Sequence, residues 1–325
     1  MNAVVDVLVR AKGQSHFDLL ALPLRVGSAP EQLKLNCGIH MTSTPRTTVP
    51  AGACDSHIHI YGDLQRFAFV PYGDVHTPVH FVDEYLQVHR ALGLSRAVIV
   101  QTPLYETDNA CVLDNIAKMR AALGADCARG IAIVAPDVSD AELAELHAGG
   151  VRGLRFGIEL YKGMDPQHLE AVAARIAPLG WHIQYRSTHD DLPVLAQRLG
   201  ALPVPVCIDH LGSIDPSYAI EHPAFQALLG MLAGGNCWVK LSAPYQLSRC
   251  GPPNYEDFDA QAKVLVAAAP HRMVWGTNWP HPKVDWHPDE ALLLDVLQRW
   301  CPDNGTVNRV LVDNPAQLYD FPALG

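Results

Sequence analysis

The 325-residue sequence predicts an α/β fold in which eight parallel strands and their helices close into a (β/α)8 barrel, the TIM barrel. Two observations support this prediction. From Ala51 onward, short apolar runs rich in β-branched residues alternate with longer amphipathic segments of helical period. In addition, the first run is followed by YGDLQRF, and not by the glycine-rich phosphate loop that is typical of an open, doubly wound sheet.

The expected strands are short runs of apolar and β-branched residues bounded by polar or turn-forming ones. These eight runs are 53–60, 97–102, 130–135, 153–156, 182–186, 206–209, 237–242 and 273–277. Segments with helical spacing lie between them, and two more follow the last strand. The expected helices are 82–92, 109–123, 140–148, 165–179, 192–199, 223–233, 255–269, 288–300 and 315–319. Asp140 and Asp165 are suitable N-caps for two of these helices.

Residues 51–325 are expected to form a single domain, because barrels of this class typically need about 250 residues. Residues 1–50 show no clear period. We expect them to be an N-terminal arm, or a translated upstream extension if the natural start is Met41.

The composition is that of an ordinary globular enzyme, with 49% hydrophobic and 18% charged residues. A net charge of −10 without any run of Lys or Arg argues against nucleic acid and acidic membranes as partners. No apolar stretch is long enough to span a bilayer. The eight cysteines are scattered and form no C-x-x-C pair, which favours a reducing cytoplasm. A monomer or a homodimer is expected.

Three histidines are expected at the carboxyl ends of strands, where the active sites of such barrels lie. His57 and His59 are two residues apart in DSHIH, so one strand directs both rings to the same side. They could bind one metal ion, surround one anion, or be satisfied core histidines. His210 ends a later strand in IDHLG. Asp209 beside it either orients a ring nitrogen or points outward into the helix layer.

Two arginines also follow strands. Arg155 lies in GLRF, and Arg186 in WHIQYR shares one face with Gln184. Guanidinium groups at neighbouring strand ends suit bidentate binding of a carboxylate or sulfonate. The alternative for each arginine is a salt bridge to a loop carboxylate such as Glu159 or Asp190.

Further polar residues near the expected strand ends are candidates for substrate contact, although loop residues are more often solvated. Asn278 follows the last strand in GTNWPHP. The other four candidates are Thr102, Tyr161, Arg249 and His281.

Several segments resemble the amidohydrolase superfamily, specifically the branch of 2-pyrone-4,6-dicarboxylate lactonases, with sulfomuconolactone hydrolases and galactarolactone isomerases as relatives. They are GACDSHIHIYG, VIVQT with TDNA, GIAIVAPDVSDAELAELHAGGVRGLRF, GWHIQY, VCIDHLG, WVKLSAP with GPP, and MVWGTNWPHP. Each is weak alone, but their order and spacing extend from about residue 51 to the C-terminus. The resemblance implies an amidohydrolase-like TIM barrel that hydrolyses a lactone.

The resemblance also implies roles for the strand-end residues. In the family, the paired histidines and the histidine of the sixth strand polarise the lactone carbonyl. The corresponding residues here are His57, His59 and His210. Arg155 matches an arginine near the substrate. The pyrone lactonases work without a divalent metal, and this chain lacks the fourth-strand lysine of binuclear members. We therefore expect no required cofactor; a single zinc ion, if bound, would use the same three histidines.

Two departures from the family pattern bear on function. The family's water-activating aspartate on the eighth strand is Asn278 here, and an amide cannot accept a proton near neutral pH. Either Asn278 replaces an aspartate in this chain, or a native asparagine changes the mechanism. Tyr161 and Arg186 also differ from the family, so the substrate is not expected to be the pyrone dicarboxylate itself.

The main hypothesis is hydrolysis of an anionic lactone, such as a muconolactone-type intermediate of aromatic catabolism. Arg155 and Arg186 would hold the anion, Asn278 would position water, and His281 or His210 would act as base. The alternative is a lactone isomerase for sugar-diacid lactones, whose nucleophile is a substrate hydroxyl. A second alternative is a barrel that binds an anion without catalysis.

Overall fold

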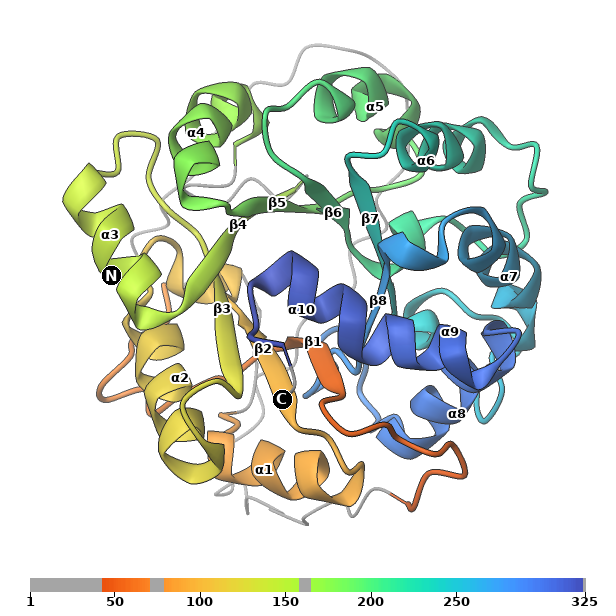
Figure 1. The fold of residues 1–325 in the computed structure, drawn as a ribbon, viewed down its shortest axis with the longest axis horizontal. Helices are drawn as coiled ribbons and strands as arrows, with labels where there is room; N and C mark the ends of the chain where they lie inside the picture. Colours follow the sequence, from red (N-terminus) through yellow and green to blue (C-terminus); the bar gives the residue numbers. More distant parts are fainter. Residues whose placement is uncertain (1–42, 71–78, 158–164, 324–325) are drawn as a thin grey trace, which may run out of the picture. The chain divides into compact units, whose positions relative to one another are not determined.

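The computed structural model describes residues 43–70, 79–157 and 165–323, and it shows a parallel β-barrel surrounded by helices (Figure 1). Its eight strands are hydrogen-bonded in sequence order, each parallel to the next. They are β1 (Cys54–Ile58), β2 (Arg96–Val100), β3 (Ala128–Ala132), β4 (Val151–Gly157), β5 (His182–Arg186), β6 (Val206–Ile208), β7 (Cys237–Ser242) and β8 (Met273–Gly276). The (β/α)8 prediction is confirmed, and every strand overlaps one of the expected runs.

The barrel closes where β1 meets the residues that follow β8. The Asn278 N–H donates to the His57 carbonyl at 2.8 Å, and the His59 N–H donates to the Trp279 carbonyl at 2.7 Å. Gly276 allows this approach, because a Cβ at that position would lie 2.7 Å from the His57 backbone nitrogen. The closure therefore places Asn278 directly beside the two histidines of β1.

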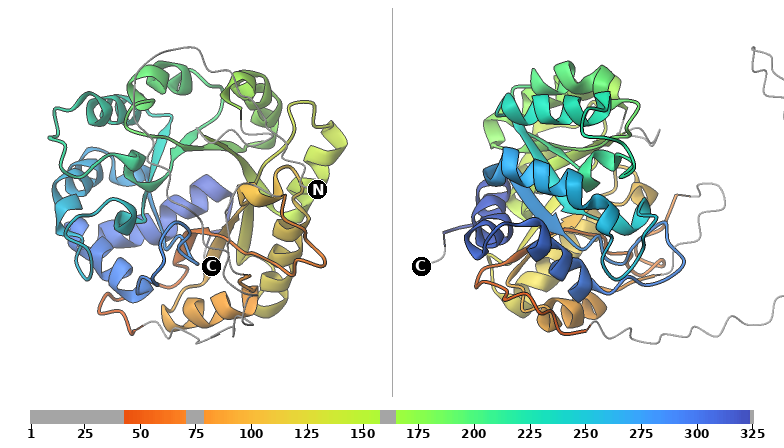
Figure 2. Two further views of the ribbon diagram at one scale, coloured as in Figure 1. Left: turned by 180° about the vertical axis from the view of Figure 1, so that it is seen from behind. Right: turned by 90° about the vertical axis from the view of Figure 1, so that its right-hand side faces the viewer.

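The helices surround the barrel, except that α10 lies across one end of it (Figures 1 and 2). They are α1 (Val82–Ala91), α2 (Ala110–Leu123), α3 (Asp140–Gly149), α4 (Leu169–Ile176), α5 (Leu192–Gly200), α6 (Pro223–Ala233), α7 (Asp259–Ala268), α8 (Glu290–Trp300), α9 (Asn304–Asn308) and α10 (Asn314–Tyr319). Of these, α9 was not expected, because five residues are too few to show a helical period.

The predicted N-caps require one correction. Ser139, and not Asp140, caps α3: its hydroxyl accepts a hydrogen bond from the Glu142 N–H at 3.1 Å. Asp165 does accept from the Gln167 N–H at 2.8 Å, but it begins a short 3₁₀ turn that precedes α4.

The N-terminal ends of the strands are covered by α10 and the residues after it (Figure 1). Leu318, Tyr319 and Phe321 pack against barrel-interior side chains such as Cys54 and Trp238. The Arg129 guanidinium donates to the Asp320 carbonyl at 2.8 Å. Because this end is filled by apolar packing, polar chemistry is confined to the opposite end of the strands.

Part of the expected N-terminal arm contacts α8. Arg46 forms an ion pair with Asp295 at 2.9 Å, and the Thr47 hydroxyl donates to the same carboxylate at 2.9 Å. Residues 1–42 lie outside the described residues. Within the described part of the chain, none of the helices has the length and hydrophobicity needed to cross a membrane.

Candidate active site

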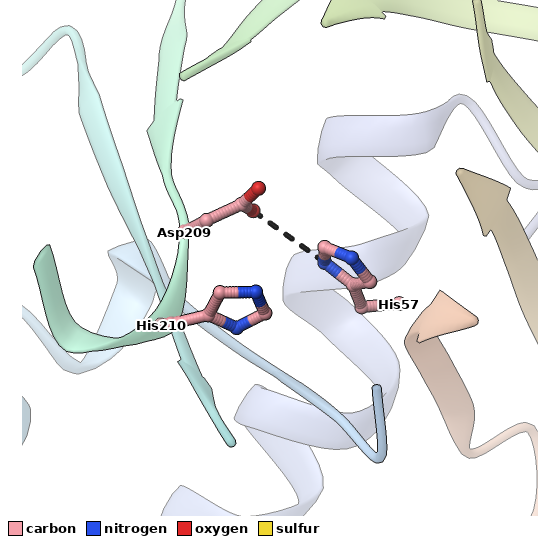
Figure 3. Close-up of side chains that lie close together, drawn as sticks. All are labelled: His57, Asp209 and His210. Atoms are coloured by element: carbon pink, nitrogen blue, oxygen red, sulfur yellow. Dashed lines mark ion pairs between the residues drawn. The ribbon is translucent and has the colours of Figure 1, made fainter. Parts of the chain in front are cut away.

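The structure brings the three predicted histidines together at the C-terminal ends of β1 and β6. Figure 3 shows His57 and His210 with Asp209 beside them. The Nε2 atoms of His57 and His59 are 3.1 Å apart. The ring centroids of His57 and His210 are 4.8 Å apart. All three side chains are buried, so one substrate group can contact more than one imidazole without competing bulk water.

Behind these rings lies a buried ion pair that the sequence analysis did not identify. Lys240 of β7 places its ammonium 3.2 Å from Asp209 Oδ1, and both side chains are fully buried. Gln184 joins them: its carbonyl accepts from Lys240 at 2.8 Å, and its amide donates to Asp209 Oδ2 at 3.0 Å. Asp209 therefore points into the barrel, which decides between the two orientations left open by the sequence. The available signal was a lysine at an interior position of the apolar strand WVKLS.

This ion pair fixes the hydrogen position on His57. The Lys240 Nζ is 3.2 Å from His57 Nδ1, closer than Asp209 Oδ1 at 3.5 Å (dashed line in Figure 3), and an ammonium can only donate. His57 Nδ1 is therefore an acceptor, and its Nε2 carries the hydrogen. His59 Nδ1 faces the Val100 carbonyl at 2.8 Å and must donate to it, which leaves His59 Nε2 free to accept from His57. The result is a neutral imidazole that presents an N–H toward the site.

Charge and burial keep the imidazoles neutral. Burial, and then the Lys240 ammonium, hold the pKa of His57 well below its ordinary range. Burial and the neighbouring Arg155 lower the pKa of His59 to about 3. Burial tends to raise the pKa of Asp209, but Lys240 and His57 outweigh it and bring that pKa well below the usual value. Asp209 is therefore the ionised partner of Lys240.

Both predicted anion-binding arginines lie beside the histidines. Arg155 is buried on β4, donates to the Gln101 carbonyl at 2.9 Å, and acts electrostatically on His59. Arg186 ends the neighbouring strand β5, lies 3.4 Å from Gln246 Oε1, and acts electrostatically on His210. Among the described residues, no carboxylate forms an ion pair with Arg155. The two guanidinium groups therefore come from neighbouring strands, and each acts on a different histidine of the cluster.

Asn278 and His281 lie in a second polar network. The Asn278 Nδ2 donates to the Tyr245 hydroxyl at 2.8 Å, and that hydroxyl is 3.1 Å from His281 Nδ1. His281 Nε2 is 2.9 Å from Glu290 Oε1. The buried Oδ1 of Asn278 has no hydrogen-bond partner among the described residues. Tyr245 and Glu290 were missed by the sequence analysis.

The other predicted site residues receive less support. The Thr102 hydroxyl caps the short turn that follows β2, accepting from the Leu104 N–H at 3.5 Å. Arg249 is exposed and forms an ion pair with Asp215 at 2.7 Å. Tyr161 lies outside the described residues. Substrate contacts by these three residues remain predictions.

The same region offers ligand atoms for a metal ion, but they fit one poorly. Among the described residues here, His57, Asp209 and His210 lie close enough to share an ion, so Asp209 takes the place predicted for His59. A dication at Asp209 would adjoin the Lys240 ammonium, which already occupies that carboxylate at 3.2 Å. In addition, His57 would have to give up the hydrogen bond from Lys240. We therefore derive no step through a metal.

Comparisons with known proteins identify the relatives of this chain. The chain is 37% identical to a 2-pyrone-4,6-dicarboxylate hydrolase of Comamonas testosteroni, over 85% of this chain and 93% of that protein. It is 30% identical to a 4-sulfomuconolactone hydrolase of Hydrogenophaga intermedia, over 88% and 94%. It is also 30% identical to a D-galactarolactone isomerase of Agrobacterium fabrum, over 85% and 94%.

A solved apo structure from Agrobacterium tumefaciens superimposes with a TM-score of 0.78 at 28% identity, covering 87% of this chain and 98% of that one. The model of the amidohydrolase family matches residues 54–321, which span every strand of the barrel and the three histidines. The chain therefore belongs to the amidohydrolase family.

Proposed function

We propose that this chain is a lactonase that hydrolyses the ring ester of a small anionic lactone. The observation that carries the proposal is the buried group of neutral imidazoles with the Lys240–Asp209 ion pair behind it. Arg155 and Arg186, on neighbouring strands, act electrostatically on two of these histidines. The two lactone hydrolases among its relatives support the same reaction.

The imidazoles would act on the lactone carbonyl. A neutral His57 presents its Nε2–H, and the carbonyl oxygen can replace His59 as the acceptor when substrate binds. Lys240 strengthens this donor from behind, because a cation on Nδ1 draws electron density from the ring. Donors aimed at a developing oxyanion are worth about 3–4 kcal/mol each. His59 would mainly orient His57, since its own Nε2 accepts.

Asn278 would hold the attacking water. Its Oδ1 is buried without a partner, while its Nδ2 is held by Tyr245 at 2.8 Å. A water donating to this oxygen would lie next to the carbonyl-binding histidines, because Asn278 is bonded to the His57 backbone. An amide fixes the orientation of that water but takes no proton from it.

The arginines would bind the carboxylate or sulfonate of the substrate. We expect Arg186→Met to raise KM about 10–100-fold with a smaller change in kcat, because a charged hydrogen bond is worth about 1.5–3 kcal/mol. Arg198→Met is the matched control: Arg198 pairs with Glu170 on the outer helices, so KM should not change. Steady-state kinetics on both variants measure the effect. An unchanged KM for Arg186→Met would remove that residue from the anion site.

The reaction itself is tested by product analysis in ¹⁸O-labelled water with a panel of anionic lactones. Hydrolysis places one labelled oxygen in the ring-opened acid. An isomerase, the activity that the name of the Agrobacterium fabrum relative describes, would transfer a substrate hydroxyl and incorporate no label. Stabilisation by the lactones without turnover of any of them would instead indicate a barrel that only binds.

No metal is required in this proposal, since Lys240 supplies the buried positive charge. Prolonged dialysis against a chelator should leave kcat unchanged within error, and elemental analysis should find far less than one equivalent of zinc. A rate that falls on chelation and returns with zinc alone would contradict this part of the proposal.

The setting of the reaction follows from the same chemistry. Muconolactone-type compounds arise in the breakdown of aromatic rings, and we place the enzyme in that process, in the cytoplasm, as a monomer or homodimer. The described cysteines are all free thiols, six of them buried, which fits a reducing compartment.

A further inference from the structure

A chain of hydrogen bonds leads from Asn278 away from the histidine cluster. It runs from Asn278 to the Tyr245 hydroxyl (2.8 Å), to His281 Nδ1 (3.1 Å), and from His281 Nε2 to Glu290 Oε1 (2.9 Å). The four side chains are between 0% and 6% exposed. They come from the residues after β7, the residues after β8 and the first residue of α8, so their alignment depends on the fold.

The direction of every bond in this chain is set by Glu290. Its carboxylate accepts only, so His281 Nε2 donates and His281 Nδ1 must be an acceptor. The Tyr245 O–H therefore donates to His281, and the Tyr245 oxygen accepts from the Asn278 amide. A proton taken up at the Tyr245 oxygen can pass to His281 as the original hydroxyl proton moves onto Nδ1.

We propose that Tyr245 and His281 form the proton relay that activates the attacking water, with Glu290 as the positioning residue. This inference rests on the proposed lactonase function. As the water oxygen bonds to the lactone carbonyl carbon, the water proton moves to Tyr245 Oη and the Tyr245 proton to His281 Nδ1. When the ring C–O bond breaks, the proton returns through Tyr245 to the leaving ring oxygen, and the products are a hydroxyl and a carboxylic acid.

The charges around the two candidate bases favour His281 over His210. His57, Arg186 and Lys240 act electrostatically against a charge on His210, and the neighbouring Asp209 carboxylate opposes them. Protonation of His210 would therefore add to a positive cluster.

His281 instead donates to Glu290, and its other titratable neighbours are Tyr245, His287 and His80. Burial lowers the pKa of His281, but the hydrogen bond to Glu290 opposes this effect, so an imidazolium there has a buried counter-ion. His287 Nε2 also contacts Glu290 Oε1, at 3.0 Å.

Tyr245→Phe tests the relay, because it removes one oxygen and keeps the ring. We expect kcat to fall about 100-fold or more, within the range for loss of acid–base catalysis, with little change in KM. Tyr85→Phe is the matched control: it removes a buried hydroxyl that donates to Asp55 at 3.2 Å, on the helix side of the barrel. The kcat of Tyr85→Phe should stay within about threefold of the wild-type value, because the hydrogen bond that it loses is not part of the relay.

The pH dependence of kcat in Glu290→Gln distinguishes the relay from a purely structural role of Glu290. Removing the carboxylate lowers the pKa of His281, so the acid limb of the kcat profile should shift to lower pH while kcat falls. An unshifted limb, or a Tyr245→Phe enzyme with wild-type kcat, would overturn the relay. A wild-type chain that incorporates no ¹⁸O into any lactone would instead refute the lactonase proposal, so the two failures are distinguishable.

Discussion

Replacing Lys240 with methionine is expected to lower the free energy of unfolding by about 3–5 kcal/mol and to abolish turnover. Lys240 is fully buried and is the only cation that forms an ion pair with Asp209 among the described lysines and arginines. Its loss leaves Asp209 ionised and buried, or forces that carboxylate to take up a proton. It also frees Gln184 and His57 Nδ1, so the hydrogen on His57 is no longer directed toward the substrate.

The matched comparison is the double variant Lys240→Met with Asp209→Asn. Because it removes both charges, it should recover most of the lost stability, yet it should remain inactive since no cation stands behind His57. Urea unfolding followed by tryptophan fluorescence gives both free energies. If the single and the double variant lose the same free energy of unfolding, the loss comes from changed packing and not from the broken ion pair.

The fold could be predicted because barrel strands carry a strong local signal. Each of the eight apolar runs is bounded by turn-forming residues, and each became a strand within a few residues of the expected ends. The short α9 was missed because five residues show no helical period, and the Ser139 cap was missed because the neighbouring Asp140 is equally suitable as a cap.

The site could be predicted where the signal lies at a strand end. His57, His59 and His210 follow apolar runs directly, and a parallel barrel necessarily brings such ends together. Lys240 gave a weaker signal, since a lysine inside a strand is normally an exposed residue. Tyr245 and Glu290 could not have been found, because they are 45 residues apart and only the closed barrel aligns them on His281.

The structure also gives a reason for an amide on the eighth strand. A carboxylate at position 278 would compete with His281 for the Tyr245 proton, and it would place a negative charge within the closure between β8 and β1. Asn278 instead donates to Tyr245, so the Tyr245 proton is directed to His281 and the Asn278 Oδ1 is left without a hydrogen-bond partner among the described residues. In the proposed mechanism, the amide orients the water and the relay takes its proton, whereas a single aspartate could do both.

Asn278→Asp is therefore expected to make turnover largely independent of Tyr245. The new carboxylate can take the water proton directly, a contribution of about 10²–10⁴ in rate for a positioned base. In the wild-type background Tyr245→Phe should cost about 100-fold in kcat, whereas in the Asn278→Asp background it should cost less than about tenfold.

The four kcat values form a double-mutant cycle whose coupling measures the shared role. Equal losses in both backgrounds would mean that Tyr245 acts apart from the water, and the relay would be wrong. Asn278→Ala is the control for shape: it removes the water-binding oxygen without adding a base, so it should lower kcat in both backgrounds. An Asn278→Asp enzyme as slow as Asn278→Ala would show that a carboxylate at this position cannot reach the water at all.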